Sequence, residues 1–294
     1  AYLEHGMHNL PQPVRMYYFC PVFRYERPQA GRFREHHQFG VEVLGDADPS
    51  VDAEVIELAW RLMITLGLKN TSLLINSIGD TECRPAYVSE LKNYYRGHES
   101  KLCAECRQRL DRNPLRLLDC KVETCRGLGD EAPRSSDHLC QACQDHWSSL
   151  RGYLDAVAIP YEIDHRLVRG LDYYSRTVFE IQPVEGGAQS TICGGGRYDG
   201  LIEGLGGRPT PGIGFATGME RLALNLERGG VEVPNEPSPK YLVANVGDVA
   251  RPAALELAAR LRANGVGAIL SSGSRGLRGQ MRQANALGIP YTAI

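Results

Sequence analysis

The most informative stretch of this chain is FRYERPQAGR at residues 23–32, which runs on to Gln38 and Glu42. Strand-like patterns at 20–26 and 38–44 flank proline and glycine turn signals, so the stretch predicts a β-hairpin. We therefore expect two paired strands joined by a polar turn near the start of the chain.

The polar side chains of this hairpin gather on one face. Side chains alternate across a strand, so Arg24 and Glu26 share a face. The same rule puts Gln38, Gly40 and Glu42 on one face of the second strand. A guanidinium beside two carboxylates and an amide suits a ligand with both an anionic and a cationic part. The alternative is a solvated, salt-bridged hairpin, because surface ion pairs are common and contribute little.

Three further strings in the chain are long and specific. They read LVRGLDYY at 167–174, GGGRYDGL at 194–201 and GIGFATGMERL at 212–222. The hairpin resembles motif 2 of class II aminoacyl-tRNA synthetases, in the form found in histidyl-tRNA synthetases. The other strings are similar to the two histidine-specific motifs of that family and to class II motif 3. One Gly-rich match would be weak evidence, but four long strings in the family's order make the resemblance specific.

The resemblance implies an α+β fold: the antiparallel sheet of class II synthetases flanked by helices, a helical insertion and a truncated C-terminal α/β anticodon-binding domain. Composition agrees, because the chain becomes charged and Cys-rich from about His98, and strand and helix patterns alternate as β-α-β-α at its end. The predicted parts are a catalytic core in two pieces (1–97 and 166–228), the insertion (98–165), a Gly- and Pro-rich linker (229–239) and an incomplete anticodon-binding domain (240–294).

The two ends of the chain predict a fragment of a longer protein. It opens without Met at Ala1, within a helix-like pattern, and closes on a strand pattern at 289–294. By the resemblance, motif 1 and an Arg-Pro-Glu-Gly-Thr string that holds the substrate's amino group would lie before Ala1. Motif 1 builds the dimer interface in that family. We therefore expect a homodimer of the full-length parent, and the activity of this piece alone is an open question.

Composition excludes several classes of protein. Of the 294 residues 43% are hydrophobic, enough for one large and one smaller core, and a net charge of −2 supplies no global basic field for nucleic acid. No apolar run approaches the roughly 20 residues of a membrane span, and no signal peptide is seen. Nine cysteines without a secretory signal indicate a reducing compartment. We expect a cytoplasmic protein with no membrane partner.

The resemblance implies a ligase that uses ATP with Mg²⁺ to convert L-histidine to histidyl-adenylate and then transfers histidine to tRNA(His). A protein promotes such chemistry mainly by positioning and by preorganised positive charge. Guanidinium groups match carboxylates and phosphates with two hydrogen bonds, so Arg24 and Arg169 are the predicted catalytic residues. For Arg169 a loop salt bridge is the alternative. The adjacent Gly170 weakens that alternative, because it lets backbone approach a ligand closely.

Four residues are predicted to bind ATP. Arg221 falls in the first turn of a helix, where a cation opposes the helix dipole by about 0.3–1 kcal/mol. An anionic ligand explains that placement, and compensation by Glu220 is the alternative. One departure from the family is His36, at a position where an aromatic hydrocarbon ring is usual. This departure does not change the register of the neighbouring motif residues. The predicted ATP-binding residues are Arg24, Glu26, Arg32 and Arg221.

Selection of histidine requires groups that read two ring nitrogens, because a pocket that hydrogen-bonds a polar group rejects analogues lacking it. Acidic, amide and tyrosine side chains offer acceptors, donors and flat walls. The resemblance puts the residue matching Glu42 opposite the imidazole and two adjacent tyrosines along the pocket; core packing explains a tyrosine pair equally well. The predicted histidine-binding residues are Arg24, Gln38, Glu42, Arg169, Tyr173, Tyr174 and Tyr198.

Two Cys-x2-Cys pairs lie in the predicted insertion, with Cys120 and Cys125 between them. A tetrahedral zinc–thiolate site needs four converging sulfurs, which two such pairs supply. Reduced thiols packed among the helices are the alternative, since the pairs are widely separated and the family does not generally need zinc. The predicted ligands of a structural Zn²⁺ are Cys103, Cys106, Cys140 and Cys143.

The partners implied by the resemblance are tRNA(His), L-histidine and ATP. Arg275, Arg278 and Arg282 lie along one side of the last predicted helix, which fits phosphate contact in an anticodon-binding domain but also a solvated face. The competing function is a non-catalytic, histidine-binding regulatory subunit of ATP phosphoribosyltransferase. The motif arginines and the C-terminal domain favour the enzyme, because that paralogue typically lacks one or the other.

Overall fold

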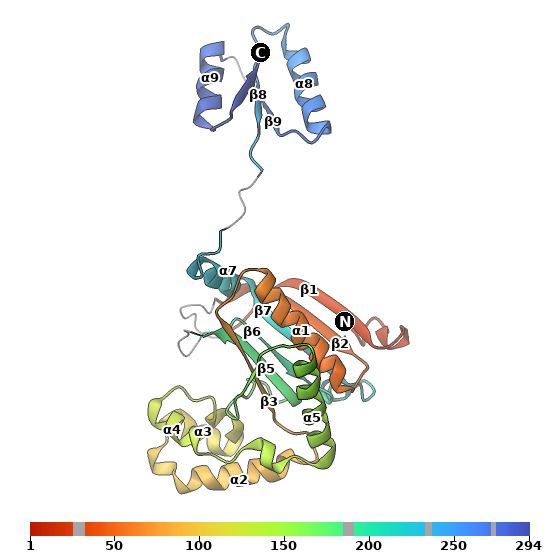
Figure 1. The fold of residues 1–294 in the computed structure, drawn as a ribbon, viewed down its shortest axis with the longest axis vertical. Helices are drawn as coiled ribbons and strands as arrows, with labels where there is room; N and C mark the ends of the chain where they lie inside the picture. Colours follow the sequence, from red (N-terminus) through yellow and green to blue (C-terminus); the bar gives the residue numbers. More distant parts are fainter. Residues whose placement is uncertain (26–32, 185–190, 233–236, 272–274) are drawn as a thin grey trace. The chain divides into compact units, whose positions relative to one another are not determined.

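The computed structural model describes residues 1–25, 33–184, 191–232, 237–271 and 275–294 (Figure 1). They form two compact units, Ala1–Val231 and Glu232–Ile294. None of the described helices combines the length and the apolar character that a membrane span requires.

The larger unit is built on a seven-stranded sheet with the order β1-β2-β7-β6-β5-β3-β4. Neighbouring strands are antiparallel except β3 and β4. The antiparallel sheet expected of the α+β fold is therefore confirmed. The strands are β1 (Val14–Phe23), β2 (Glu35–Leu44), β3 (Thr71–Ser77), β4 (Glu162–Ile163), β5 (Ser175–Pro183), β6 (Cys193–Arg197) and β7 (Gly212–Gly218).

The hairpin predicted at the start of the chain is formed by β1 and β2. They pair antiparallel, with Tyr18 opposite Gly40 and Cys20 opposite Gln38. Residues 26–32 of the turn lie outside the described part of the chain. Because β2 also pairs with β7, the polar face of the hairpin continues into the middle of the sheet.

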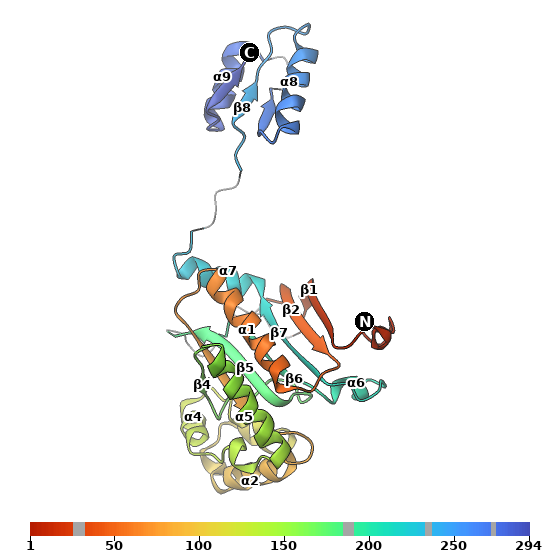
Figure 2. The ribbon, with the colours of Figure 1, turned by 45° about the vertical axis from the view of Figure 1, so that its right-hand side comes forward.

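Helices α1 (Pro49–Thr65) and α5 (Gln141–Ala156) cover one face of this sheet (Figure 2). The Asp48 side chain caps α1 by accepting a hydrogen bond from the Ser50 N–H at 2.8 Å, and Pro49 occupies the first turn. Apolar residues of both helices pack on the strands, including Ile56, Met63 and Leu150. Burial of each such side chain contributes about 1.5–3 kcal/mol.

One ion pair lies inside this apolar layer. Arg197 and Asp52 are both fully buried, and His146 Nε2 lies 2.9 Å from Asp52 Oδ2. Burial alone would raise the pKa of Asp52, but the hydrogen bonds and charges of His146 and Arg197 outweigh it and lower that pKa. The carboxylate therefore stays charged and joins α1, α5 and β6.

A helical cluster covers part of the opposite face of the sheet. Its apolar core includes Leu74 of β3 and Val178 of β5. Helix α2 belongs to this cluster although it precedes residue 98, whereas α5 lies inside 98–165 and packs on α1 instead. The cluster contains α2 (Arg84–Gly97), α3 (Ala104–Arg112), α4 (Glu123–Asp130) and the 3-10 turns η2 (Glu99–Lys101), η3 (Pro114–Leu117) and η4 (Ser135–His138).

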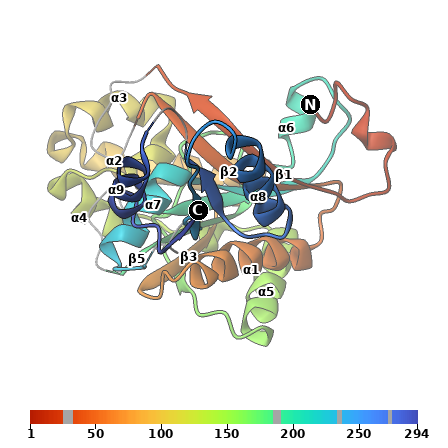
Figure 3. The ribbon, with the colours of Figure 1, turned by 90° about the horizontal axis from the view of Figure 1, so that it is seen from above.

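The N-terminal segment lies beside α6 at one end of the larger unit (Figure 3). Tyr2 and Ile202 share a small apolar core with Val14, Leu44 and Tyr198. Helix α7 follows β7 directly, which places its first turn at the end of a central strand. The elements are η1 (Met7–Asn9), α6 (Leu201–Gly204) and α7 (Met219–Arg228).

The smaller unit has the predicted alternation of strands and helices. Its three parallel strands have the order β10-β8-β9. Leu242 packs with Ala284 of α9, while its neighbour Val243 packs with Ala258 of α8, so the two helices cover opposite faces. The elements are β8 (Tyr241–Val243), α8 (Arg251–Ala263), β9 (Ala268–Leu270), α9 (Leu277–Ala286) and β10 (Tyr291–Ala293).

Candidate functional site

Small residues form the floor of the sheet face that the helical cluster leaves open. Gly40 pairs with Ala216, Ala216 with Gly194, and Gly214 with Gly196, so these positions are neighbours on three adjacent strands. Because these glycines have no side chains, large side chains from neighbouring strands lie directly on the backbone. A Cβ atom added at Gly40 would overlap the Tyr18 ring, and one added at Gly214 would overlap Glu42. Glycine is therefore required at these points for the site to form.

Three predicted arginines line one cavity of about 230 Å³ on this floor. Arg24 comes from the end of β1, Arg169 from the loop before β5, and Arg221 from the first turn of α7. Gln38 lines the same cavity. The structure thus brings together cations that lie up to 197 positions apart in the sequence (221 − 24).

Arg24 lies against His36, which the sequence interpretation treated only as a departure from the family. Arg24 Nη2 is 2.7 Å from His36 Nε2. Burial of the imidazole, and then the charge of Arg24, lower the pKa of His36. The ring is therefore neutral at pH 7 and accepts a hydrogen bond from the guanidinium, which orients Arg24 at the cavity wall.

Arg169 rests on Gly194, where an added Cβ would lie 2.5 Å from its Nη1 atom. Nη1 donates to the Glu180 carboxylate, which also accepts a hydrogen bond from Thr191 Oγ1 at 2.7 Å. The guanidinium carbon lies 5.7 Å from the centre of the Tyr174 ring. Among the described residues, its buried Nε finds no hydrogen-bond partner. The predicted salt bridge is thus present, but it leaves one donor of the guanidinium unused.

A carboxyl group and three tyrosines form a second group beside the arginines. Tyr198 donates a hydrogen bond to Glu42 Oε2. Tyr173 stacks on Tyr174 with ring centres 4.7 Å apart and meets Tyr198 edge-on at 6.0 Å. Burial raises the pKa of Glu42 to about 7, so this group exchanges a proton near neutral pH. A carboxyl group among tyrosine rings offers the groups that hydrogen-bond and flank a flat, polar ring.

Two predicted ATP-binding residues, Glu26 and Arg32, lie outside the described part of the chain. At the start of α7, Glu220 and Arg221 have different partners. The Glu220 carboxylate accepts a hydrogen bond from the His37 backbone N–H at 2.8 Å and lies 2.9 Å from His37 Nδ1. Arg221 donates to the Thr191 carbonyl at 2.8 Å and lines the cavity. Glu220 lines the same cavity, with its carboxylate bound to His37.

Sequence interpretation missed Tyr18 and Glu180. Tyr18 lies on β1 directly opposite Gly40, with its hydroxyl 3.4 Å from Gln38 Oε1. Glu180 is an acid in the middle of a strand whose neighbours Phe179 and Ile181 are fully buried. That pattern was the available signal, since a carboxylate between two buried residues needs a partner on the other face.

The four predicted zinc ligands do not come together, and that prediction is wrong. The structure divides the cysteines between two clusters. Each Cys-x2-Cys pair meets other side chains, because α3 belongs to the helical cluster while α5 packs on α1. The clusters are Cys103, Cys106, Cys120 and Cys125, and separately Asp80, Cys83, Cys140 and Cys143.

Similarity to known proteins covers the whole chain. The family model described as histidyl-tRNA synthetase matches residues 2–222. The chain is 56% identical over all 294 residues to a histidine–tRNA ligase of Dehalococcoides mccartyi and covers 70% of that relative. It is 49% identical over the same length to one of Caldanaerobacter subterraneus, again covering 70%. A crystal structure of apo S. aureus histidyl-tRNA synthetase is similar with a TM-score of 0.79 at 39% identity, covering 99% of this chain and 71% of that one.

Proposed function

Because this chain belongs to the histidyl-tRNA synthetase family, we propose that its open sheet face catalyses the ATP-dependent attachment of histidine to tRNA(His). One observation carries the proposal. Arg24, Arg169 and Arg221 line a single cavity, and Arg169 lies beside a group of tyrosine rings that includes the Glu42–Tyr198 hydrogen bond. Cations next to a ring-binding pocket suit a reaction between an anionic nucleotide and a substrate with a polar ring.

In the first step a carboxylate oxygen of histidine attacks the α-phosphorus of ATP. The bond from that phosphorus to its bridging oxygen breaks, and pyrophosphate leaves with Mg²⁺, which enters with ATP as part of the substrate. We assign Arg24 to the α-phosphate and Arg169 to the carboxylate, because each guanidinium can give two parallel hydrogen bonds to such groups. These donors lower the barrier by stabilising charge as it moves onto phosphate oxygens.

The histidine side chain is assigned to the pocket of Glu42, Tyr173, Tyr174 and Tyr198. Glu42 near its pKa can accept a hydrogen bond from an imidazole N–H, and the tyrosine rings flank a flat ligand. Gln38, which lines the arginine cavity, lies where it can contact the rest of the amino acid. In the second step a ribose hydroxyl of tRNA attacks the activated carbonyl carbon, and AMP leaves.

The smaller unit is assigned to tRNA contact. Arg275, Arg278 and Arg282 of the α9 region are all exposed, which suits phosphate binding. We further propose that the complete protein is a homodimer in the cytoplasm. The cytoplasm is proposed because a chain with nine cysteines and no disulfide between them suits a reducing compartment.

The test is pyrophosphate exchange into ATP, measured with the complete protein. Exchange that requires L-histidine, and that histidinol does not support, is the expected result, because histidinol lacks the attacking carboxylate. Histidine binding without exchange would instead indicate the regulatory subunit of ATP phosphoribosyltransferase. The names of the similar proteins favour the ligase over that alternative.

A further inference from the structure

Four cysteine side chains in the helical cluster converge on one point and have no part in the proposed reaction. Their sulfur atoms all lie within 4.8 Å of one another, and three of the four residues are buried. They come from three segments: the start of α3, the turn after η3, and α4. The four are Cys103, Cys106, Cys120 and Cys125, spaced as Cys-x2-Cys-x13-Cys-x4-Cys.

The separation of these sulfurs fits a tetrahedral metal. Zinc–sulfur bonds of about 2.3 Å place neighbouring sulfurs about 3.8 Å apart. Cys103 Sγ and Cys120 Sγ are 3.9 Å apart. Backbone N–H groups also point at the sulfurs: the Cys106 N–H donates to Cys103 Sγ at 3.4 Å, and the Cys103 N–H donates to Cys125 Sγ at 3.2 Å. Such donors stabilise the thiolate that a metal requires.

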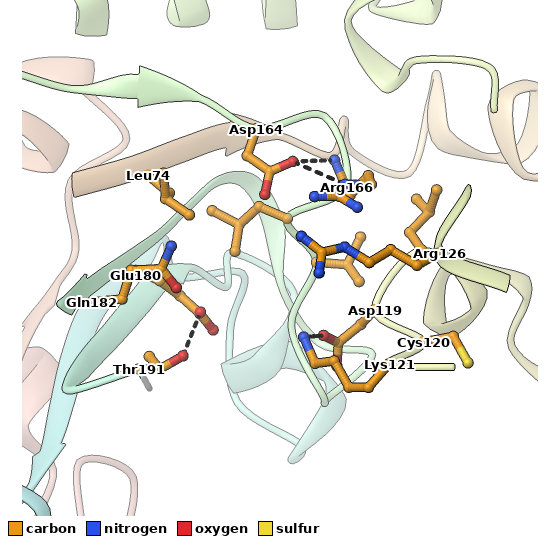
Figure 4. A pocket seen from close by; sticks show the side chains of 13 residues that line it. Leu74, Asp119, Cys120, Lys121, Arg126, Asp164, Arg166, Glu180, Gln182 and Thr191 are labelled. Atoms are coloured by element: carbon orange, nitrogen blue, oxygen red, sulfur yellow. Dashed lines mark hydrogen bonds and ion pairs between the residues drawn. The ribbon is translucent and has the colours of Figure 1, made fainter. Parts of the chain in front are cut away.

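Neither a disulfide nor simple packing of thiols accounts for this cluster as well as a metal does. A disulfide needs sulfurs about 2.05 Å apart, and all four thiols are free. Packed thiols need apolar neighbours but do not need one another, so four sulfurs converging on one point would be coincidental. Cys120 also lines a cavity of about 200 Å³ together with Lys121 and Arg126 (Figure 4). Lys121 there is paired with Asp119 at 2.7 Å, and Arg126 follows Cys125 on α4.

We propose that Cys103, Cys106, Cys120 and Cys125 bind one Zn²⁺ as a structural site. Helices α3 and α4 have nine and eight residues, too few to be stable on their own in water. A metal that joins them adds a cross-link between two short helices that local hydrogen bonds alone would not hold.

The proposed zinc site also affects the cavity lined by Arg24, Arg169 and Arg221. This effect on the cavity rests on the proposed function. Segment 107–119 lies between the second and third ligands, so the metal restrains both of its ends. From that segment Arg116 Nη1 donates to the Gly170 carbonyl at 2.9 Å, and Asn113 donates to the Asp172 carboxylate. The zinc thereby holds the loop that carries Arg169.

The second cluster does not support the same inference. Its carboxylate, Asp80, already accepts a hydrogen bond from Cys143 at 3.0 Å and pairs with Arg176 at 3.1 Å. A cation bound there would have to compete with Arg176. Cys143 therefore serves as a reference position in the test.

The test measures zinc per polypeptide in the purified complete protein by mass spectrometry of the metal. Wild type and the control Cys20→Ser, which alters a cysteine outside both clusters, should carry the same amount. Cys120→Ser and Cys125→Ser should each carry about one equivalent less. A wild type without zinc, or equal zinc in Cys120→Ser and wild type, would overturn the site.

A second measurement does not depend on how well those variants fold. Zinc is replaced by Co²⁺ in the Cys143→Ser protein, in which the second cluster is reduced from three sulfurs to two while the proposed site keeps all four. We expect the strong thiolate-to-cobalt absorption and the visible bands of tetrahedral Co²⁺. Their absence would reject the tetrathiolate site.

The coupling to the loop has its own readout. Removal of the metal should raise KM for histidine about tenfold while changing KM for ATP little, because Arg169 is assigned to the amino acid carboxylate. Equal KM values with and without zinc would reject the coupling but not the metal site, which the metal content decides independently of any activity.

Discussion

Arg169 and Arg197 come from two strings of the same kind, and each pairs with a carboxylate, but the structure uses them differently. The side chains of Arg197 and Asp52 are 0% exposed, whereas those of Arg169 and Glu180 each keep 20%. Protein groups surround Arg197 on all sides, including the Asp199 carboxylate at 3.0 Å. Arg169 keeps an Nε without a partner among the described residues and lines a cavity.

The difference shows how packing decides what an ion pair does. A fully buried ion pair in which every N–H donor has a partner joins elements of the core. Removing one member leaves the other charge buried, with neither a partner nor solvent. A pair at the edge of a cavity leaves part of its guanidinium exposed to a ligand and tolerates the loss of one member. A match to a sequence motif does not distinguish a structural arginine from a ligand-binding one. The exposure of the side chain and the hydrogen-bond partners of its N–H groups distinguish them.

The largest effect should follow removal of Arg197. Arg197→Leu leaves the Asp52 carboxylate buried with less compensation and should lower the free energy of unfolding by about 3–5 kcal/mol. Urea denaturation at pH 7 measures this. The double variant Asp52→Leu/Arg197→Leu should recover part of the loss, because no charge is left alone. Unchanged stability with lost activity would instead make Arg197 a ligand-binding group and remove its difference from Arg169.

The second effect concerns Arg169 and should appear in activity rather than stability. Arg169→Gln should lower kcat/KM for histidine in pyrophosphate exchange about 10²- to 10³-fold, as loss of a charge-stabilising donor does. Its free energy of unfolding should change by less than about 1 kcal/mol, since the pair with Glu180 is partly exposed. The control is Arg15→Gln on β1, which breaks an exposed pair with Glu54 of α1. Destabilisation comparable with that of Arg197→Leu would contradict the contrast between the two arginines.

A smaller effect should follow from the floor under Arg169. Gly194→Ala puts a Cβ 2.5 Å from Nη1, and a flexible guanidinium moves before backbone does, so KM for histidine should rise about tenfold with stability nearly unchanged. Gly200→Ala in the same string is the matched control, because nothing lies within 4 Å of its added Cβ. Similar kinetics for both variants would show that Arg169 does not depend on the glycine floor.

The smallest effect tests Glu42, a buried acid with a hydrogen bond from Tyr198 rather than a paired cation. Its pKa is about 7 in the folded protein against an ordinary value of 4.5 for a solvated glutamate side chain, so the folded state holds the proton more tightly. The stability this contributes is complete below pH 4.5 and is lost as pH rises through 7. Glu42→Gln does not titrate. The free energy of unfolding of wild type relative to Glu42→Gln should therefore fall progressively between pH 4.5 and 8. A difference that is independent of pH would show that Glu42 is charged throughout.

Much of the fold could be predicted from local patterns. Alternation of side chains and turn residues near FRYERPQAGR predicted the β1–β2 hairpin, and the β-α-β-α pattern predicted the smaller unit. The arginines that line the cavity were candidates because of residue type and motif. The partners of those residues were not predictable. Glu180 meets Arg169 only because β5 pairs with β6 in a register that sets Glu180 opposite Gly194.

The cysteines show the same limit most clearly. Spacing suggested that Cys103 and Cys106 join Cys140 and Cys143, but packing joined the first pair to Cys120 instead. The helices that carry the two pairs belong to different apolar cores, which no local spacing records.

The sequence by itself determined which segments become strands and helices, and which residue types were available to bind anions, a ring or a metal. Those properties depend on backbone preferences and on neighbours within a few positions. Only the tertiary structure decided which arginine is sealed and which faces a cavity, and which sulfurs meet. Such choices depend on strand register and helix packing between distant segments, where a shift of one residue turns a side chain to the other face.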